Sequence, residues 1–259
     1  MRLVAGAVIA ALLFGCAQMP LKAHAAPAPA VQTLELTLAE RRTQVDFHLP
    51  AGTVPPRGAV VLAHGFTRDR RTMAGHASLL AEHGVLAVVP DLPFVTDSRS
   101  NARALSDLVA RLRRGEDSIA VARVVLVGFS AGGLAALLAA DAPGVVGYVG
   151  LDPFDRPGGV GRDKAATLMI PSRLVRAPSS ACNAFSIAEP WTQALRRLEQ
   201  DRIIEAASHC DFESPTDQLC QLVCGKTDPA RQKAVRDALL QAVQRWLPST
   251  VETALPPAH

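Results

Sequence analysis

The hydrophobic positions of the chain change between two periods, one typical of strands and one typical of helices. Residues 31–38 and 43–50 alternate apolar with polar side chains, as half-exposed antiparallel strands do. Residues 59–64, 85–92, 123–130 and 145–152 are almost continuously apolar, which indicates strands covered on both faces. Two further strands are predicted at 166–175 and 202–207.

Segments with the helical period lie between and after these strands. They cover residues 72–84, 101–115, 131–144, 189–200 and 230–247. Alternation of strands with helices predicts an α/β fold, with a mostly parallel central sheet and helices on both faces. The two leading strands would form an antiparallel edge, and functional residues are expected where the parallel strands end.

Composition and charge narrow the class of protein. The 259 residues are 49% hydrophobic and 20% charged, which suits one globular domain, placed here at residues 31–247. A net charge of +3 gives no reason to expect a nucleic-acid partner or attraction to a membrane surface. We expect the protein to be a monomer. We also expect residues 248–259, which follow the domain, to form a disordered tail.

The first 25 residues have the pattern of an export signal. Arg2 precedes an apolar run from Leu3 to Gly15, which is too short to span a bilayer but fits a signal segment. The sequence LFGC resembles a lipobox and would make Cys16 a lipid anchor, although Phe14 is large for that motif. The sequence AHA at 23–25 offers an ordinary cleavage site instead. Both interpretations predict export, either as a membrane-anchored periplasmic lipoprotein or as a secreted protein.

Four cysteines remain beyond residue 16, all in the last third of the chain: Cys182, Cys210, Cys220 and Cys224. An even number in an exported chain predicts two disulfides, with three possible connectivities. Zinc is the weaker alternative, because no histidine stands at a usual ligand spacing from Cys220 and Cys224. We therefore predict no metal and no cofactor.

One serine stands where a buried strand meets a helix, in Gly128-Phe129-Ser130-Ala131-Gly132. Such a strand–turn–helix setting holds a nucleophilic serine in a strained backbone, and flanking glycines remove side chains that would clash. The helix start also favours developing negative charge near the serine. On these features the chain resembles the α/β-hydrolase superfamily over residues 31–247.

The resemblance implies an oxyanion hole made of two backbone N–H groups. Ala131 would supply the first. The second would come from the loop after the strand at 59–64, where His64-Gly65 resembles the family's oxyanion loop and Phe66 follows. His64 itself is expected to be structural.

The family's chain order of serine, acid and histidine points to His209 as the base. No other histidine lies both after the serine and inside the domain. Many relatives carry the acid after the strand predicted at 166–175, but the loop there contains no carboxylate before Glu189. The segment GLDPFD resembles that of chlorophyllases and related esterases, which implies Asp152 as the acid. Asp155 and Glu189 remain alternatives.

These residues predict an exported serine hydrolase that cleaves a small-molecule carboxylic ester through an acyl-enzyme. The short segment after Asp152 leaves no room for a helical cap domain, so an open cleft is expected, with Phe129, Phe154 and Trp191 as substrate-binding candidates. Alternatives are a catalytically idle binding lipoprotein on the same fold, and a hydrolase of the thioesterase or peptidase type.

Overall fold

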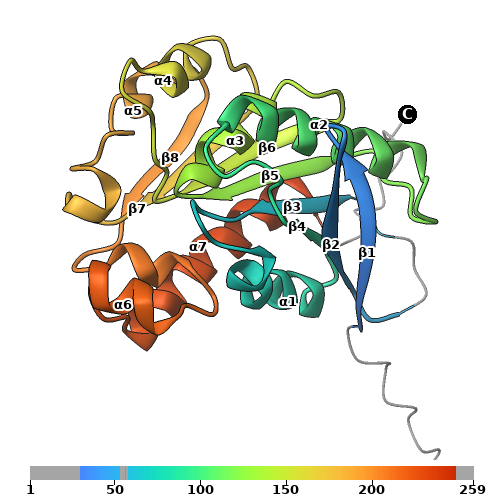
Figure 1. Cartoon of the computed structure of the whole chain (residues 1–259), viewed down its shortest axis with the longest axis horizontal. Helices are drawn as coiled ribbons and strands as arrows, with labels where there is room; N and C mark the ends of the chain where they lie inside the picture. The colour runs from blue at the N-terminus through green and yellow to red at the C-terminus, as the bar shows by residue number, and fades with distance from the viewer. Residues whose placement is uncertain (1–29, 53–55, 57, 249–259) are drawn as a thin grey trace, which may run out of the picture.

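A computed structural model describes residues 30–52, 56 and 58–248. The predicted signal segment 1–25, Cys16 and residues 249–259 of the predicted tail lie outside the described residues. The centre of the molecule is an eight-stranded sheet in the order β1-β2-β4-β3-β5-β6-β7-β8 (Figure 1). The strands are β1 (Ala30–Leu38), β2 (Arg41–Leu49), β3 (Ala59–Ala63), β4 (Leu86–Pro90), β5 (Val124–Phe129), β6 (Val145–Leu151), β7 (Ser172–Arg176) and β8 (Leu198–Ile203).

The pairing directions agree with the predicted sheet. β1 pairs antiparallel with β2, and β2 pairs antiparallel with β4, so the two leading strands form an antiparallel edge. All later neighbours are parallel, from β4 and β3 through to β8. The ends of β3, β5 and β6 therefore meet at one edge of the sheet, where the candidate site lies.

Helices cover both faces of the sheet. α2 and α3 lie on one face and α1 and α7 on the other (Figure 1). Among the helices of the described segments, none has the length and apolar character needed to cross a membrane. The helices are α1 (Ala74–Glu82), α2 (Ser98–Arg114), α3 (Ala131–Ala139), α4 (Val160–Ala165), α5 (Trp191–Ala194), α6 (Gln218–Cys224) and α7 (Pro229–Trp246), with 3₁₀ turns η1 (Arg70–Met73), η2 (Ala181–Asn183) and η3 (His209–Phe212).

The continuous apolar runs are explained by this two-sided cover. Along β5, Leu126 packs with the cluster under α2 and α3, while its neighbours Val125 and Val127 pack with the cluster under α1 and α7. Every residue of β3, β4 and β5 is buried. A strand buried on both faces needs apolar side chains at each position, so it loses the alternation seen in β1 and β2.

The helix predicted at 189–200 is wrong in its second half. α5 ends at Ala194, and Leu198–Ile203 forms the edge strand β8. Glu199, in the last turn of the predicted helix, instead pairs across the strands with Arg173 of β7 at 3.5 Å. Asp201, just beyond the predicted helix, accepts from Arg176 of β7 at 2.8 and 2.6 Å. Charged residues on an edge strand also discourage pairing with another chain.

The strands predicted at 166–175 and 202–207 are too long or displaced. Only Ser172–Arg176 of the first is a strand, because α4 and its turn occupy the segment before Pro171. The short helices α4 and α6 were not predicted. Between β6 and β7 the only α-helix of the described chain is the six-residue α4, so no helical cap domain is present there.

A buried histidine joins α1 to the loop that follows β8. His76 is 1% exposed, and its Nε2–H donates to the carbonyl oxygen of Phe212 at 3.0 Å. Burial lowers the pKa of His76 to about 4. The unfolded chain therefore binds a proton at this position below about pH 6.5 that the native protein does not bind until about pH 4.

This difference predicts that the free energy of unfolding falls as the pH is lowered from about 6.5 towards 4. Between pH 7 and pH 5 the contribution of His76 should be roughly 2 kcal/mol. His76→Gln should remove that share of the pH dependence, while His83→Gln, at an exposed histidine after α1, should leave it unchanged. Urea unfolding of the three proteins at both pH values measures this, and equal pH dependence in all three would contradict the assignment.

Candidate active site

Ser130 occupies the sharp turn between β5 and α3. Its backbone angles are φ 53° and ψ −124°, a strained conformation for a residue with a side chain. The turn is fixed by backbone hydrogen bonds: the N–H of Ser130 donates to Leu151 at 3.1 Å, and its carbonyl accepts from Phe154 at 3.0 Å. The strain is therefore maintained by the neighbouring end of β6.

The two glycines around Ser130 are required by close backbone contacts. A Cβ on Gly132 would lie 2.2 Å from the carbonyl oxygen of His64, at the end of β3. A Cβ on Gly128 would lie 2.3 Å from the carbonyl oxygen of Gly132. Only glycine permits these close approaches. The glycines two residues before and two residues after Ser130 are therefore required for steric reasons.

His209 and Asp152 are joined by a short hydrogen bond. Asp152 follows β6 directly, and its Oδ2 accepts from Nδ1 of His209 at 2.5 Å. The other oxygen, Oδ1, accepts from the backbone N–H of Ala177 at 3.0 Å and from Nδ2 of Asn183 at 3.3 Å. With Nδ1 of His209 donating, Nε2 is left as the proton-accepting nitrogen of the neutral ring.

Asn183 was missed in the sequence, although it lies in the loop where an acid was sought. It is 1% exposed, and its Oδ1 accepts from the backbone N–H groups of Ser180 and Ser186 at 2.9 and 3.0 Å. Its amide group therefore has a fixed orientation towards Asp152. The loop after β7 supplies a hydrogen-bond donor to the carboxylate instead of a carboxylate of its own.

The alternative acids have other environments. Asp155 is buried and accepts hydrogen bonds from the backbone of Arg156, Gly161 and Arg162, and from Nε1 of Trp191 at 2.7 Å. These four donors hold the turn before α4, and none of them is a histidine. Glu189 is exposed, beyond η2.

The loop that carries His209 is held by buried polar contacts. Asp211 is fully buried and accepts from the backbone N–H of Asp228 at 2.8 Å and from Nε of Arg231 at 2.7 Å. The ring of Phe129 lies 4.6 Å from the His209 ring, centroid to centroid. The loop thus contacts α7 on one side and the end of β5, before Ser130, on the other.

Both predicted disulfides are present, and both end on α6. Cys210 pairs with Cys220 and Cys182 with Cys224, with Cα–Cα distances of 5.9 and 5.6 Å. One bridge therefore starts next to His209 and the other next to Asn183. The sulfurs of Cys210, Cys220 and Cys224 lie within 4.8 Å of one another, but each is already bonded to a second sulfur.

The predicted oxyanion donors lie on two adjacent segments. A Cβ on Gly65 would be 3.3 Å from Cβ of Ser130, so the loop after β3 reaches the serine directly. Among the residues that the structure describes, neither the N–H of Phe66 nor that of Ala131 has an acceptor within the chain. Such free backbone donors suit an incoming oxyanion.

His64 and Arg68 hold this loop in place. Nε2 of His64 accepts from the N–H of Leu92 at 2.8 Å, and Nδ1 donates to the carbonyl of Gly65 at 2.8 Å. Burial lowers the pKa of His64, which keeps the ring neutral in this bracing role. Arg68 forms ion pairs with Glu213 at 2.6 Å and Asp217 at 2.8 Å. No pattern in the sequence indicated that Arg68 connects the loop after β3 to the loop that carries His209.

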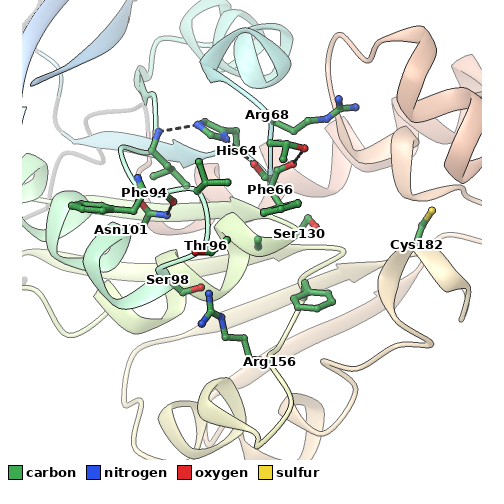
Figure 2. A pocket seen from close by; sticks show the side chains of 16 residues that line it. His64, Phe66, Arg68, Phe94, Thr96, Ser98, Asn101, Ser130, Arg156 and Cys182 are labelled. Carbon is green, nitrogen blue, oxygen red and sulfur yellow. Dashed lines mark hydrogen bonds between the residues drawn. The ribbon is translucent and has the colours of Figure 1, made fainter. Parts of the chain in front are cut away.

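Ser130 opens onto a cavity of about 400 Å³ (Figure 2). Its wall includes Phe66 and Phe154, and a smaller adjoining hollow is lined by Ser130, His209 and Phe129. Trp191 is the exception among the predicted substrate-binding residues. It is 0% exposed and bonded to Asp155, so it belongs to the core and not to the cavity wall.

Within residues 30–248, described apart from 53–55 and 57, no hydrogen bond joins Ser130 to His209. In hydrolases this contact is often long without substrate and shortens when the substrate binds. The two side chains nevertheless line the same hollow, and the His209 ring is fixed by Asp152 and Phe129. The arrangement can accept a serine proton once the hydroxyl turns towards Nε2.

Fold and site together define a class of hydrolase. The sequence model of the α/β-hydrolase family matches residues 60–259, and the chain belongs to this family. No curated protein matches the sequence.

Solved structures share the fold at low sequence identity. Dienelactone hydrolase from Anabaena variabilis is 20% identical with a TM-score of 0.67, covering 85% of this chain and 100% of its own. XC6422 from Xanthomonas campestris, described as an α/β serine hydrolase without lid, is 17% identical with a TM-score of 0.62, covering 86% and 96%. Est1E from Butyrivibrio proteoclasticus is 15% identical with a TM-score of 0.60, covering 82% and 98%.

The hydrogen bond to His209 predicts the effect of changing the acid. Asp152→Asn should lower turnover by about 10⁴-fold, because an amide favours the wrong tautomer of the ring. Glu189→Gln should stay within about tenfold of the wild type. Ester hydrolysis, with circular dichroism to check the fold, tests this, and a severe loss in Glu189→Gln alone would overturn the choice of acid.

The two disulfides predict that the mature protein from its native compartment has no free thiol among these four cysteines. Mass spectrometry without reduction should find the pairs Cys182–Cys224 and Cys210–Cys220. Mild reduction should lower activity before global structure is lost, because both bridges hold segments that contact the catalytic candidates. Four alkylatable thiols would instead favour the metal-binding alternative.

Proposed function

We propose that this α/β hydrolase is an exported serine hydrolase that cleaves small-molecule carboxylic esters. The observation that carries the proposal is the short hydrogen bond that Nδ1 of His209 donates to Asp152, beside a serine in a strained turn. A catalytically idle scaffold has no physical need for this strain and this orientation together. The N-terminal signal pattern and the two disulfides support export.

In the first half of the proposed reaction, Nε2 of His209 takes the proton of Ser130 as Oγ bonds to the ester carbonyl carbon. The oxyanion that forms accepts hydrogen bonds from the N–H groups of Phe66 and Ala131, each contributing about 3 kcal/mol. Asp152 stabilises the imidazolium. The C–O bond of the ester then breaks, and His209 gives its proton to the leaving alcohol.

In the second half, His209 takes a proton from water as the water oxygen attacks the acyl-enzyme carbonyl. Collapse of this second intermediate releases the carboxylic acid and returns the proton to Ser130. The balance is one ester and one water converted to one acid and one alcohol. The cavity beside Ser130 has the size of a small-molecule site.

A fluorophosphonate probe and a p-nitrophenyl ester test the proposed nucleophile. Ser130→Ala should lose covalent labelling and hydrolysis, falling by several orders of magnitude in turnover. Ser106→Ala, at a serine on α2 that lies outside the cavity wall, should keep both. Labelling that maps to another serine would overturn the role of Ser130, and a wild type that hydrolyses no ester would favour the idle-scaffold alternative.

A further inference from the structure

The wall of the cavity beside Ser130 contains positively charged side chains and no carboxylate. Its wall contains two arginines, Arg68 and Arg156, and no aspartate or glutamate. The charge of Arg68 is already balanced by Glu213 and Asp217. Within the described residues, the guanidinium of Arg156 has neither an ion-pair partner nor a hydrogen-bond acceptor.

Neutral hydrogen-bond donors lie at the same part of the cavity. Ser98 and Thr96 line the wall with Arg156, and in the part of the chain that the structure describes neither hydroxyl has a partner. In Figure 2 the guanidinium of Arg156 is directed towards Ser98. The first turn of α2 nearby is already capped by the Asp97 carboxylate, so the free donors are side chains.

The backbone of Arg156 has a fixed position relative to the nucleophile, and its side chain is exposed. Its backbone N–H donates to Oδ1 of the buried Asp155 at 2.7 Å. Two residues earlier, the N–H of Phe154 donates to the carbonyl oxygen of Ser130 at 3.0 Å. A negative group held by Arg156 would therefore lie at a limited range of distances from the reacting carbonyl.

The rest of the wall suits an apolar connecting segment. Leu92, Phe94, Val95 and Phe154 line the cavity between its polar groups. A low-polarity wall strengthens the attraction between a guanidinium and an anion beside it. The single uncompensated positive charge matches a group with one negative charge, and the planar guanidinium matches a carboxylate.

We infer that the substrate is an ester that carries a free carboxylate, which Arg156 binds with help from Ser98 and Thr96. This inference rests on the proposed ester hydrolysis and specifies its substrate class. Arg156 is a specificity residue in this scheme and takes no part in the proton transfers. Its contribution should appear mainly in KM, because the ion pair forms equally in the ground state and the transition state.

The test compares two esters at a time. One carries a carboxylate, and the other carries a neutral amide in its place. On the acyl side, the pair is the p-nitrophenyl monoester of suberic acid and its ω-carboxamide. On the alcohol side, the pair is the butyrate ester of 4-hydroxybenzoate and that of 4-hydroxybenzamide. We expect the wild type to prefer the carboxylate in at least one pair by about tenfold in kcat/KM.

Arg156→Gln should remove this preference by lowering kcat/KM for the carboxylate ester alone. Arg156→Lys should keep part of it, since the charge remains but the planar fork is lost. Arg162→Gln is the matched control, an exposed arginine on α4 that lies outside the cavity wall. The preference should also shrink with added salt, because a partly exposed ion pair is screened.

Equal rates within both pairs, or a preference that persists in Arg156→Gln, would overturn the inference while ester hydrolysis stands. Equal losses on charged and neutral esters in Arg156→Gln would also overturn it, since they would show a structural role. Failure of the wild type on every ester would overturn the proposed function itself, and labelling of Ser130 by the fluorophosphonate separates these cases.

Discussion

The site depends on how closely the start of α3 approaches the end of β3. Gly132 lies against the carbonyl groups of Ala63 and His64, at distances that exclude any side chain. This contact fixes the Ser130 turn and the loop through Gly65 in a single arrangement. The proposed nucleophile and both proposed oxyanion donors follow from it, because all three are backbone neighbours of the contact. A side chain at 132 would separate the serine from the loop after β3.

The His209 loop depends on different interactions, because it lies outside the sheet. The buried carboxylate of Asp211 binds Arg231 of α7, and the buried carboxylate of Glu213 binds Arg68 of the loop after β3. Both carboxylates are 0% exposed, so loss of either arginine would leave a buried charge without its partner. Such a loss typically costs about 3–5 kcal/mol. Two ion pairs thus hold the His209 loop between α7 and the loop after β3.

The sequence predicted the layered fold, and it predicted that Ser130 and Asp152 lie at strand ends. Both predictions have physical reasons. Strands covered on both faces show as uninterrupted apolar runs, and the glycines around Ser130 record steric limits of the turn. Ser130 and Asp152 come directly after such runs, so their positions in the sheet could be inferred. His209 was reached by elimination among histidines, with no strand pattern to support it.

The failures have one cause, which is that long-range contacts outweigh local periodicity. Residues 198–200 belong to β8 because they pair with β7, where Glu199 contacts Arg173, although the local pattern suggests a helix. Trp191 packs in the hydrophobic core, where its indole N–H donates to Asp155, 36 residues away in the sequence. Asn183 orients Asp152 from a loop without regular structure. No local pattern predicts any of these partners.

The proposed acid, Asp152, lies at the end of β6, and this position changes the role of the loop after β7. That loop needs no carboxylate of its own. Its Asn183 donates a hydrogen bond to Asp152, and its Cys182 forms a disulfide with α6. The second disulfide bonds α6 to Cys210, next to His209. Through its two disulfides, the seven-residue helix α6 therefore connects the loop that contacts Asp152 to the loop that carries His209. In a helix this short, hydrogen bonding alone gives little stability, so the covalent bridges make the connection rigid.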